Sequence, residues 1–185
     1  MSEFNISEKV FQAMYNAVQK ELKEINSFPR QNILNQHQSK SGVFALNNIF
    51  QEHILRYVML KNFYEDLGQN IDVKYETEVK TELGPIDLVF YKDPNKFAFE
   101  IKRWQDGSSR KRMITRDIKK LDNFRNNNKN TYCYELIFTG DKPRKSEENF
   151  REDFKDFAET QLKLLYCKSV DSDDFTVCIY LAELK

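Results

Sequence analysis

The stretch GPIDLVFYKDPNKFAFEIKRW, residues 84–104, constrains the fold of this chain more than any other. Its two apolar runs flank the tetrapeptide DPNK, whose Asp, Pro and Asn are typical turn residues. The pattern therefore predicts two antiparallel strands, residues 86–92 and 96–104, that form a hairpin about this turn. Each strand also carries an acid, Asp87 in the first and Glu100 in the second. Buried strands seldom accept such charges, so the two acids need an explanation.

The rest of the chain alternates between helical and strand-like patterns. The predicted helices cover residues 2–25, 45–67, 112–127 and a segment that begins at Ser146 and buries Phe150, Phe154, Phe157, Leu162 and Leu165. The further predicted strands are IDVKYETEV (71–79), whose alternation indicates half-burial, CYELIF (133–138) and residues 175–184. The resulting order, ααβββαβαβ, predicts an α/β fold in which helices flank a mixed central sheet of about five strands.

Composition excludes several classes of protein. The chain has 185 residues, enough for one domain with a sizeable core, and its formal net charge is zero, so a nucleic-acid partner must be met by a local basic patch. Three separated cysteines without a CxxC pattern, and only two histidines, argue against a zinc site and a disulfide framework. The polar N-terminus and short apolar runs predict a cytoplasmic protein without a membrane partner.

The predicted hairpin brings the two acids together. Folding about DPNK places Asp87 opposite Glu100, and cross-strand neighbours have Cβ atoms roughly 4.5–5.5 Å apart. Side chains alternate between faces along a strand, so Lys102 shares the face of Glu100 while Phe99 and Ile101 point the other way. Two close carboxylates repel unless a cation lies between them, and Mg²⁺ is a cation that prefers oxygen ligands. With a lysine beside them, these groups favour metal-assisted hydrolysis of a phosphodiester.

The motif Gly84-Pro85-Ile86-Asp87, followed after twelve residues by Glu100-Ile101-Lys102, resembles the PD-(D/E)xK nuclease superfamily and its restriction-endonuclease-like fold. The order of elements over residues 45–140 is similar to the family core, with residues 1–44 as a helical extension and 141–185 as a C-terminal helix and strand. The Pro stands two residues before the Asp rather than directly before it.

The resemblance implies a role for each motif residue. Asp87, Glu100 and the Ile101 carbonyl would hold Mg²⁺, for which Mn²⁺ is expected to substitute, and Lys102 would orient or activate the attacking water. Glu52, on the preceding helix, would complete the acidic site, and Glu76, Glu78 and Glu82 remain alternatives to it. The implied activity is that of an endonuclease in restriction, repair or defence, with DNA favoured over RNA as substrate and a homodimer left open.

A basic run follows the motif. From Lys102 to Arg125 there are nine basic residues against three acids, an excess that suits phosphate contacts. We expect such contacts from Arg103, Arg110, Lys111, Arg112 and Arg116. Charged helices are commonly just solvated, and strand carboxylates commonly face water. A catalytically inactive nuclease-fold protein that binds nucleic acid or a protein partner is therefore the alternative, and a small structural or inhibitory protein is a third interpretation.

Overall fold

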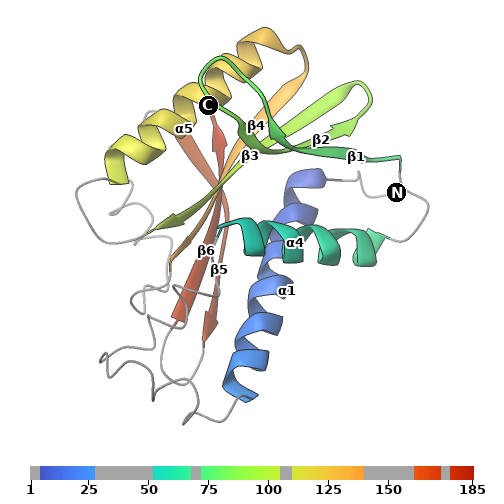
Figure 1. Cartoon of the computed structure of the whole chain (residues 1–185), viewed down its shortest axis with the longest axis vertical. Helices are drawn as coiled ribbons and strands as arrows, with labels where there is room; N and C mark the ends of the chain where they lie inside the picture. Colours follow the sequence, from blue (N-terminus) through green and yellow to red (C-terminus); the bar gives the residue numbers. More distant parts are fainter. Residues whose placement is uncertain (1–4, 28–51, 68–71, 105–109, 140–160, 172–175) are drawn as a thin grey trace.

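A six-stranded mixed sheet with flanking helices forms the protein (Figure 1). The computed structural model describes residues 5–27, 52–67, 72–104, 110–139, 161–171 and 176–185. The strands are β1 (Lys74–Val79), β2 (Ile86–Lys92), β3 (Asn95–Trp104), β4 (Thr131–Thr139), β5 (Leu162–Asp171) and β6 (Thr176–Leu184). The described helices are α1 (Ile6–Ser27), α4 (Glu52–Leu67) and α5 (Arg110–Asn127). The sheet order is β1-β2-β3-β4-β6-β5, with β3 parallel to β4 and the other neighbouring pairs antiparallel.

The sheet separates two apolar layers. Helices α1 and α4 pack on one face, where buried residues such as Val10, Met14 and Val18 recur at the spacing of an amphipathic helix. Helix α5 packs on the other face through Ile114 and Leu121 (Figure 1). The predicted α/β architecture, with helices on both faces of a mixed sheet, is therefore confirmed.

The hairpin of β2 and β3 has nearly the register expected from the sequence. The ladder runs from Lys92–Asn95 to Leu88–Phe99, which makes Asp87 and Glu100 the next residues beyond its end. Phe99 lies in the core beneath α1 and α4, whereas Glu100 contacts α5. Asp87 and Glu100 therefore lie at the point where strands β2 and β3 separate.

The C-terminal part of the chain differs from the prediction. Residues 162–171 form strand β5 rather than the end of a helix, and this raises the number of strands from five to six. Leu162 and Leu165 have helical spacing, but Leu162, Leu164 and Tyr166 have strand spacing, so this short apolar run fits both patterns. The backbone of β6, which pairs with the whole length of β5, favours the strand. The predicted helical segment from residue 146 to residue 160 lies outside the described residues.

Strand β1 also differs from the prediction of half-burial. Its residues are mostly exposed, and Tyr75 retains 46% of its accessible surface, because β1 forms an edge of the sheet. Ile71 and residues 45–51 of the second predicted helix lie outside the described part of the chain. The predicted elements that became α1, α5, β2, β3, β4 and β6 are confirmed. Among the described helices, none is long and apolar enough to cross a membrane.

Candidate active site

Asp87 lies where β2 and β3 separate. A continued ladder would pair the Ile101 amide with the backbone of β2, but this N–H donates to Asp87 Oδ2 instead, at 2.8 Å. The side chain of Asp87 thereby replaces a backbone acceptor and is tied to the amide that lies between Glu100 and Lys102. This single hydrogen bond links the first acid of the motif directly to its second half.

The chain enters β2 through a turn that only Gly adopts easily. Gly84 has φ of 116°, in the left-handed region that a side chain disfavours. Its N–H bonds to the Thr81 carbonyl at 3.3 Å. The following carbonyl, that of Pro85, accepts a hydrogen bond from Lys120 Nζ at 2.9 Å. The turn therefore directs a backbone oxygen toward helix α5.

Glu100 is almost completely buried, with 1% of its side chain exposed. Lys120 Nζ lies 2.7 Å from Glu100 Oε1, and the two side chains form an ion pair. The pKa of the Glu100 carboxyl is raised to about 9, first by burial and then by the nearby Asp87 carboxylate, although Lys120 opposes this shift. The Asp87 carboxylate is thus near enough to Glu100 to oppose its ionisation.

Asp117 of α5 holds two lysines at once. Its Oδ2 lies 3.3 Å from Lys102 Nζ, and its Oδ1 lies 3.5 Å from Lys120 Nζ. The Asp117 side chain is only 6% exposed, so it is held in this position within the protein. Asp117 therefore connects the lysine of the motif to the lysine that neutralises Glu100.

A fourth acid, Glu135 on β4, completes what we call the acidic cluster: Asp87, Glu100, Asp117 and Glu135. Glu135 is directly opposite Glu100 in the parallel ladder and has no exposed surface. Neither of its carboxyl oxygens has a hydrogen-bond partner among the described residues. Burial, then Asp117 and Glu100, raise the pKa of Glu135 well above its ordinary value, while Lys102 opposes this. Glu135 is thus driven toward its neutral form.

Arg56 of α4 approaches Asp87 from the opposite layer. Its Nη1 lies 3.6 Å from Asp87 Oδ1 and donates to the Asp87 backbone carbonyl at 3.2 Å. The same nitrogen pairs with Glu78, which has a positive φ of 54° in β1. Glu76, Glu78 and Glu82 are the alternatives to Glu52. Of these, Glu78 is linked to Asp87, because both pair with Arg56. Glu76 instead accepts a hydrogen bond from Tyr91, at 2.8 Å.

The structure places Asp87 Oδ2 on the Ile101 amide, and it links Lys102 to Asp117 and Glu100 to Lys120. Glu52 begins α4, and its side chain lies outside the described residues. The side chains of three predicted nucleic-acid contacts also lie outside that part: Arg103, Arg110 and Lys111. Arg112 and Arg116 are exposed on α5, as a phosphate contact requires.

Three members of the basic run form ion pairs within the protein instead. Lys102 and Lys120 pair with buried acids, and Arg125 pairs with Asp122 at 2.7 Å and donates to the Leu184 carbonyl at 3.3 Å. The positive excess available to a partner is therefore smaller than the sequence count indicates.

The sequence analysis missed four residues of the site, for two of which a signal was available. Asp117 follows Ile114 by three positions and precedes Leu121 by four, which places a charge on the apolar face of the helix. Glu135 interrupts the buried strand CYELIF, just as Asp87 and Glu100 interrupt theirs. Lys120 and Arg56 had no comparable signal, because their roles depend on how helices meet the sheet.

The acidic cluster has the donor chemistry of a magnesium site. Among the described residues, no group of three or more His, Cys, Asp or Glu side chains is already arranged to hold a metal ion. The cluster nevertheless offers hard oxygen donors, and burial together with the neighbouring Asp87 carboxylate raises the pKa of Glu100 to about 9. A divalent cation beside Asp87 and Glu100 would favour the ionised form of both carboxyl groups, so the chemistry of these residues fits the group.

Comparisons with known proteins do not indicate a function for this chain. No protein-family model, curated protein or solved structure matches this chain. A function for this chain must therefore be argued from the hairpin, the acidic cluster and the lysines that contact it.

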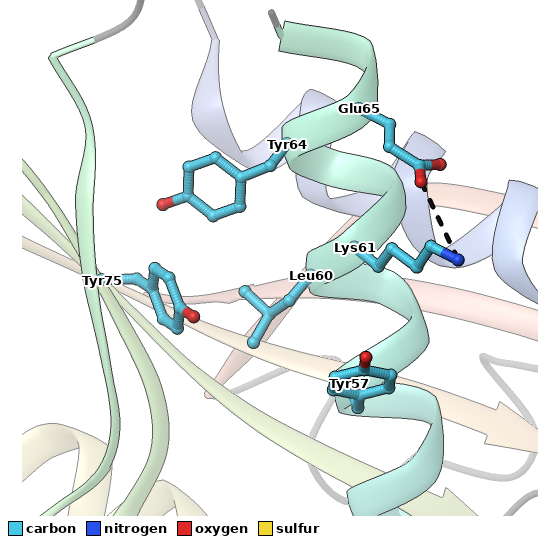
Figure 2. Close-up of a pocket in the computed structure, with 6 residues that line it drawn as sticks. All are labelled: Tyr57, Leu60, Lys61, Tyr64, Glu65 and Tyr75. Atoms are coloured by element: carbon cyan, nitrogen blue, oxygen red, sulfur yellow. Dashed lines mark ion pairs between the residues drawn. The ribbon is translucent and has the colours of Figure 1, made fainter. Parts of the chain in front are cut away.

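A separate groove lies between α4 and β1. Figure 2 shows its lining, which consists of Tyr57, Leu60, Lys61, Tyr64, Glu65 and Tyr75 and encloses about 440 Å³. The Tyr64 and Tyr75 rings lie 5.4 Å apart, and the Tyr64 hydroxyl donates to the Val73 carbonyl. No member of the acidic cluster lines this groove, so it is a surface distinct from the candidate site.

Proposed function

We propose that this protein is a Mg²⁺-dependent nuclease of the PD-(D/E)xK type, with a restriction-endonuclease-like fold and DNA as its favoured substrate. The observation that carries the proposal is the hydrogen bond from the Ile101 amide to Asp87 Oδ2. It supports the proposal because it joins Asp87 to the Glu100-Ile101-Lys102 segment, and these are the two halves of the proposed motif.

Asp87, Glu100 and the Ile101 carbonyl would hold the metal. Bound Mg²⁺ would supply Lewis-acid polarisation of a phosphoryl oxygen and lower the pKa of a water molecule. Lys102 is the residue of the motif that can direct its ammonium toward a phosphate oxygen or the attacking water, since its side chain remains 15% exposed. Asp117, whose Oδ2 lies 3.3 Å from that ammonium, forms an ion pair with it.

The substrate would be held mainly through its phosphates. Arg112 and Arg116 present exposed guanidinium groups on α5, the helix that also supplies Asp117 to the site. The proposal also includes phosphate contacts from Arg103, Arg110 and Lys111. Contacts of this kind carry little sequence information, so they support affinity for nucleic acid in general rather than a specific site.

A cleavage assay with matched variants tests the proposal. Purified protein is incubated with plasmid DNA, single-stranded DNA and RNA, with Mg²⁺, Mn²⁺ or EDTA. We expect metal-dependent cleavage that Asp87→Asn and Lys102→Met abolish. The controls Asp72→Asn and Lys119→Met make the same chemical changes at exposed positions and should cleave like the wild type. Cleavage that persists in both site variants, or that ignores EDTA, would contradict the proposal.

One observation favours the alternative of a non-catalytic nucleic-acid-binding protein. Both motif acids already have cationic neighbours, Arg56 for Asp87 and Lys120 for Glu100. Such pairs can neutralise an old metal site in a chain that no longer cleaves. DNA binding without any calorimetric Mn²⁺ binding, in a wild-type protein that cleaves no substrate, would support this alternative.

A further inference from the structure

Three oxygens of the protein lie close to the ammonium of Lys120, two of them from carboxylates and one from a backbone carbonyl. The ammonium nitrogen lies 2.7 Å from Glu100 Oε1, 2.9 Å from the Pro85 carbonyl and 3.5 Å from Asp117 Oδ1. Only 10% of the Lys120 side chain is exposed. The group is therefore bound within the protein much as a small cation would be, by two carboxylates and a carbonyl.

Three separate elements build this position. Gly84 allows the turn that presents the Pro85 carbonyl, β3 supplies Glu100, and Asp117 lies one helical turn before Lys120 on α5. The Lys120 ammonium is therefore directed at the Glu100 carboxyl group from a position that the fold itself builds.

The same carboxylate is one of the two that the proposed function assigns to the metal. A divalent cation bound to Glu100 would lie within a few ångströms of the Lys120 ammonium. Like charges a few ångströms apart repel each other, and the repulsion doubles when one of the two ions is divalent. Both cations cannot stay beside Glu100 without a large energetic cost.

We propose that Lys120 is a built-in counter-ion of the metal site, which occupies the cation position beside Glu100 until a divalent ion displaces its ammonium. This inference rests on the proposed function and describes its regulation. The tethered ammonium stabilises the metal-free protein and weakens metal binding. The site consequently loads only at divalent-ion concentrations high enough to overcome an internal competitor.

Titration calorimetry with Mn²⁺ alone tests this on the full chain. Lys120→Met removes the charge but keeps the length of the side chain, and Lys120→Gln also keeps a donor for Pro85. Lys119→Met is the matched control, because Lys119 is exposed on the same helix. We expect both Lys120 variants to bind Mn²⁺ at least about tenfold more tightly than the wild type. The control should stay within about twofold, and in EDTA the Lys120 variants should melt at lower temperature than the control.

The outcomes separate this inference from the function on which it rests. Wild-type Mn²⁺ binding with equal or weaker affinity in the Lys120 variants would overturn the counter-ion while leaving the metal site intact. Binding in the variants but not in the wild type would support the inference in its strongest form. Absence of binding in every protein would refute both. If circular dichroism shows Lys120→Met to be unfolded, the Lys120→Gln variant decides.

Discussion

Replacing Glu135 by glutamine removes a buried carboxyl whose ionisation the fold opposes. Glu135 has no exposed surface, and neither of its oxygens has a hydrogen-bond partner among the described residues. Burial, with Asp117 and Glu100, raises its pKa well above the ordinary value. In the unfolded chain the same carboxyl ionises near pH 4.3. Between these two values the folded protein keeps a proton that the unfolded chain has lost.

The sign of the pH effect follows from this difference. Because the folded state binds more protons, the stability contributed by neutral Glu135 is complete below the unfolded pKa and is lost as the pH rises toward the folded pKa. The free energy of unfolding should fall by about 1.4 kcal/mol per pH unit for this one group. Glu135→Gln carries no proton to lose and should avoid this loss at every pH between the unfolded and the folded pKa.

Urea unfolding at pH 5.5, 6.5, 7.5 and 8.5 measures this directly. The free energies of the Glu135→Gln variant and the wild type should diverge in favour of the variant as pH rises. Glu183→Gln, the same chemical change at a partly exposed position on β6, is the control and should follow the wild type. Parallel pH profiles for wild type and Glu135→Gln would refute the reasoning, because they would mean that Glu135 has the same protonation in the folded and unfolded states.

Three further changes test other parts of the structure. Gly84→Ala should lower the free energy of unfolding by about 1–3 kcal/mol, because φ of 116° strains any residue with a side chain; urea unfolding that matches the wild type would contradict this. Arg56→Met should cost about 1 kcal/mol in thermal unfolding, because two carboxylates lose their shared guanidinium, whereas the exposed Lys61→Met should be nearly neutral. Arg116→Ala should reduce the slope of log DNA affinity against log salt by about 1, which Lys163→Ala on the exposed face of β5 should leave unchanged; an unaltered slope would remove Arg116 from the phosphate-binding surface.

The core of the candidate site could be predicted because its members are close in sequence. Asp87, Glu100 and Lys102 belong to one hairpin, and a turn residue pattern together with alternation fixes which positions meet. The helical periods of α1 and α5 and the strand periods of β2, β4 and β6 are equally local, so these elements were found. Strand β5 was missed because its short apolar run fits both periods.

The sequence by itself determined that two strands would carry acids to a common point, since alternation and turn chemistry act over a few residues. Only the tertiary structure decided how those charges are compensated. The parallel pairing of β3 with β4 sets Glu135 beside Glu100, and the packing of α5 brings Asp117 and Lys120 to them. These pairings depend on which helix and strand surfaces pack together once the long loops have closed. A local sequence pattern does not predict that packing. The position of the acids in the β2–β3 hairpin therefore follows from the local sequence, whereas the residues that pair with them are set by the packing of distant elements.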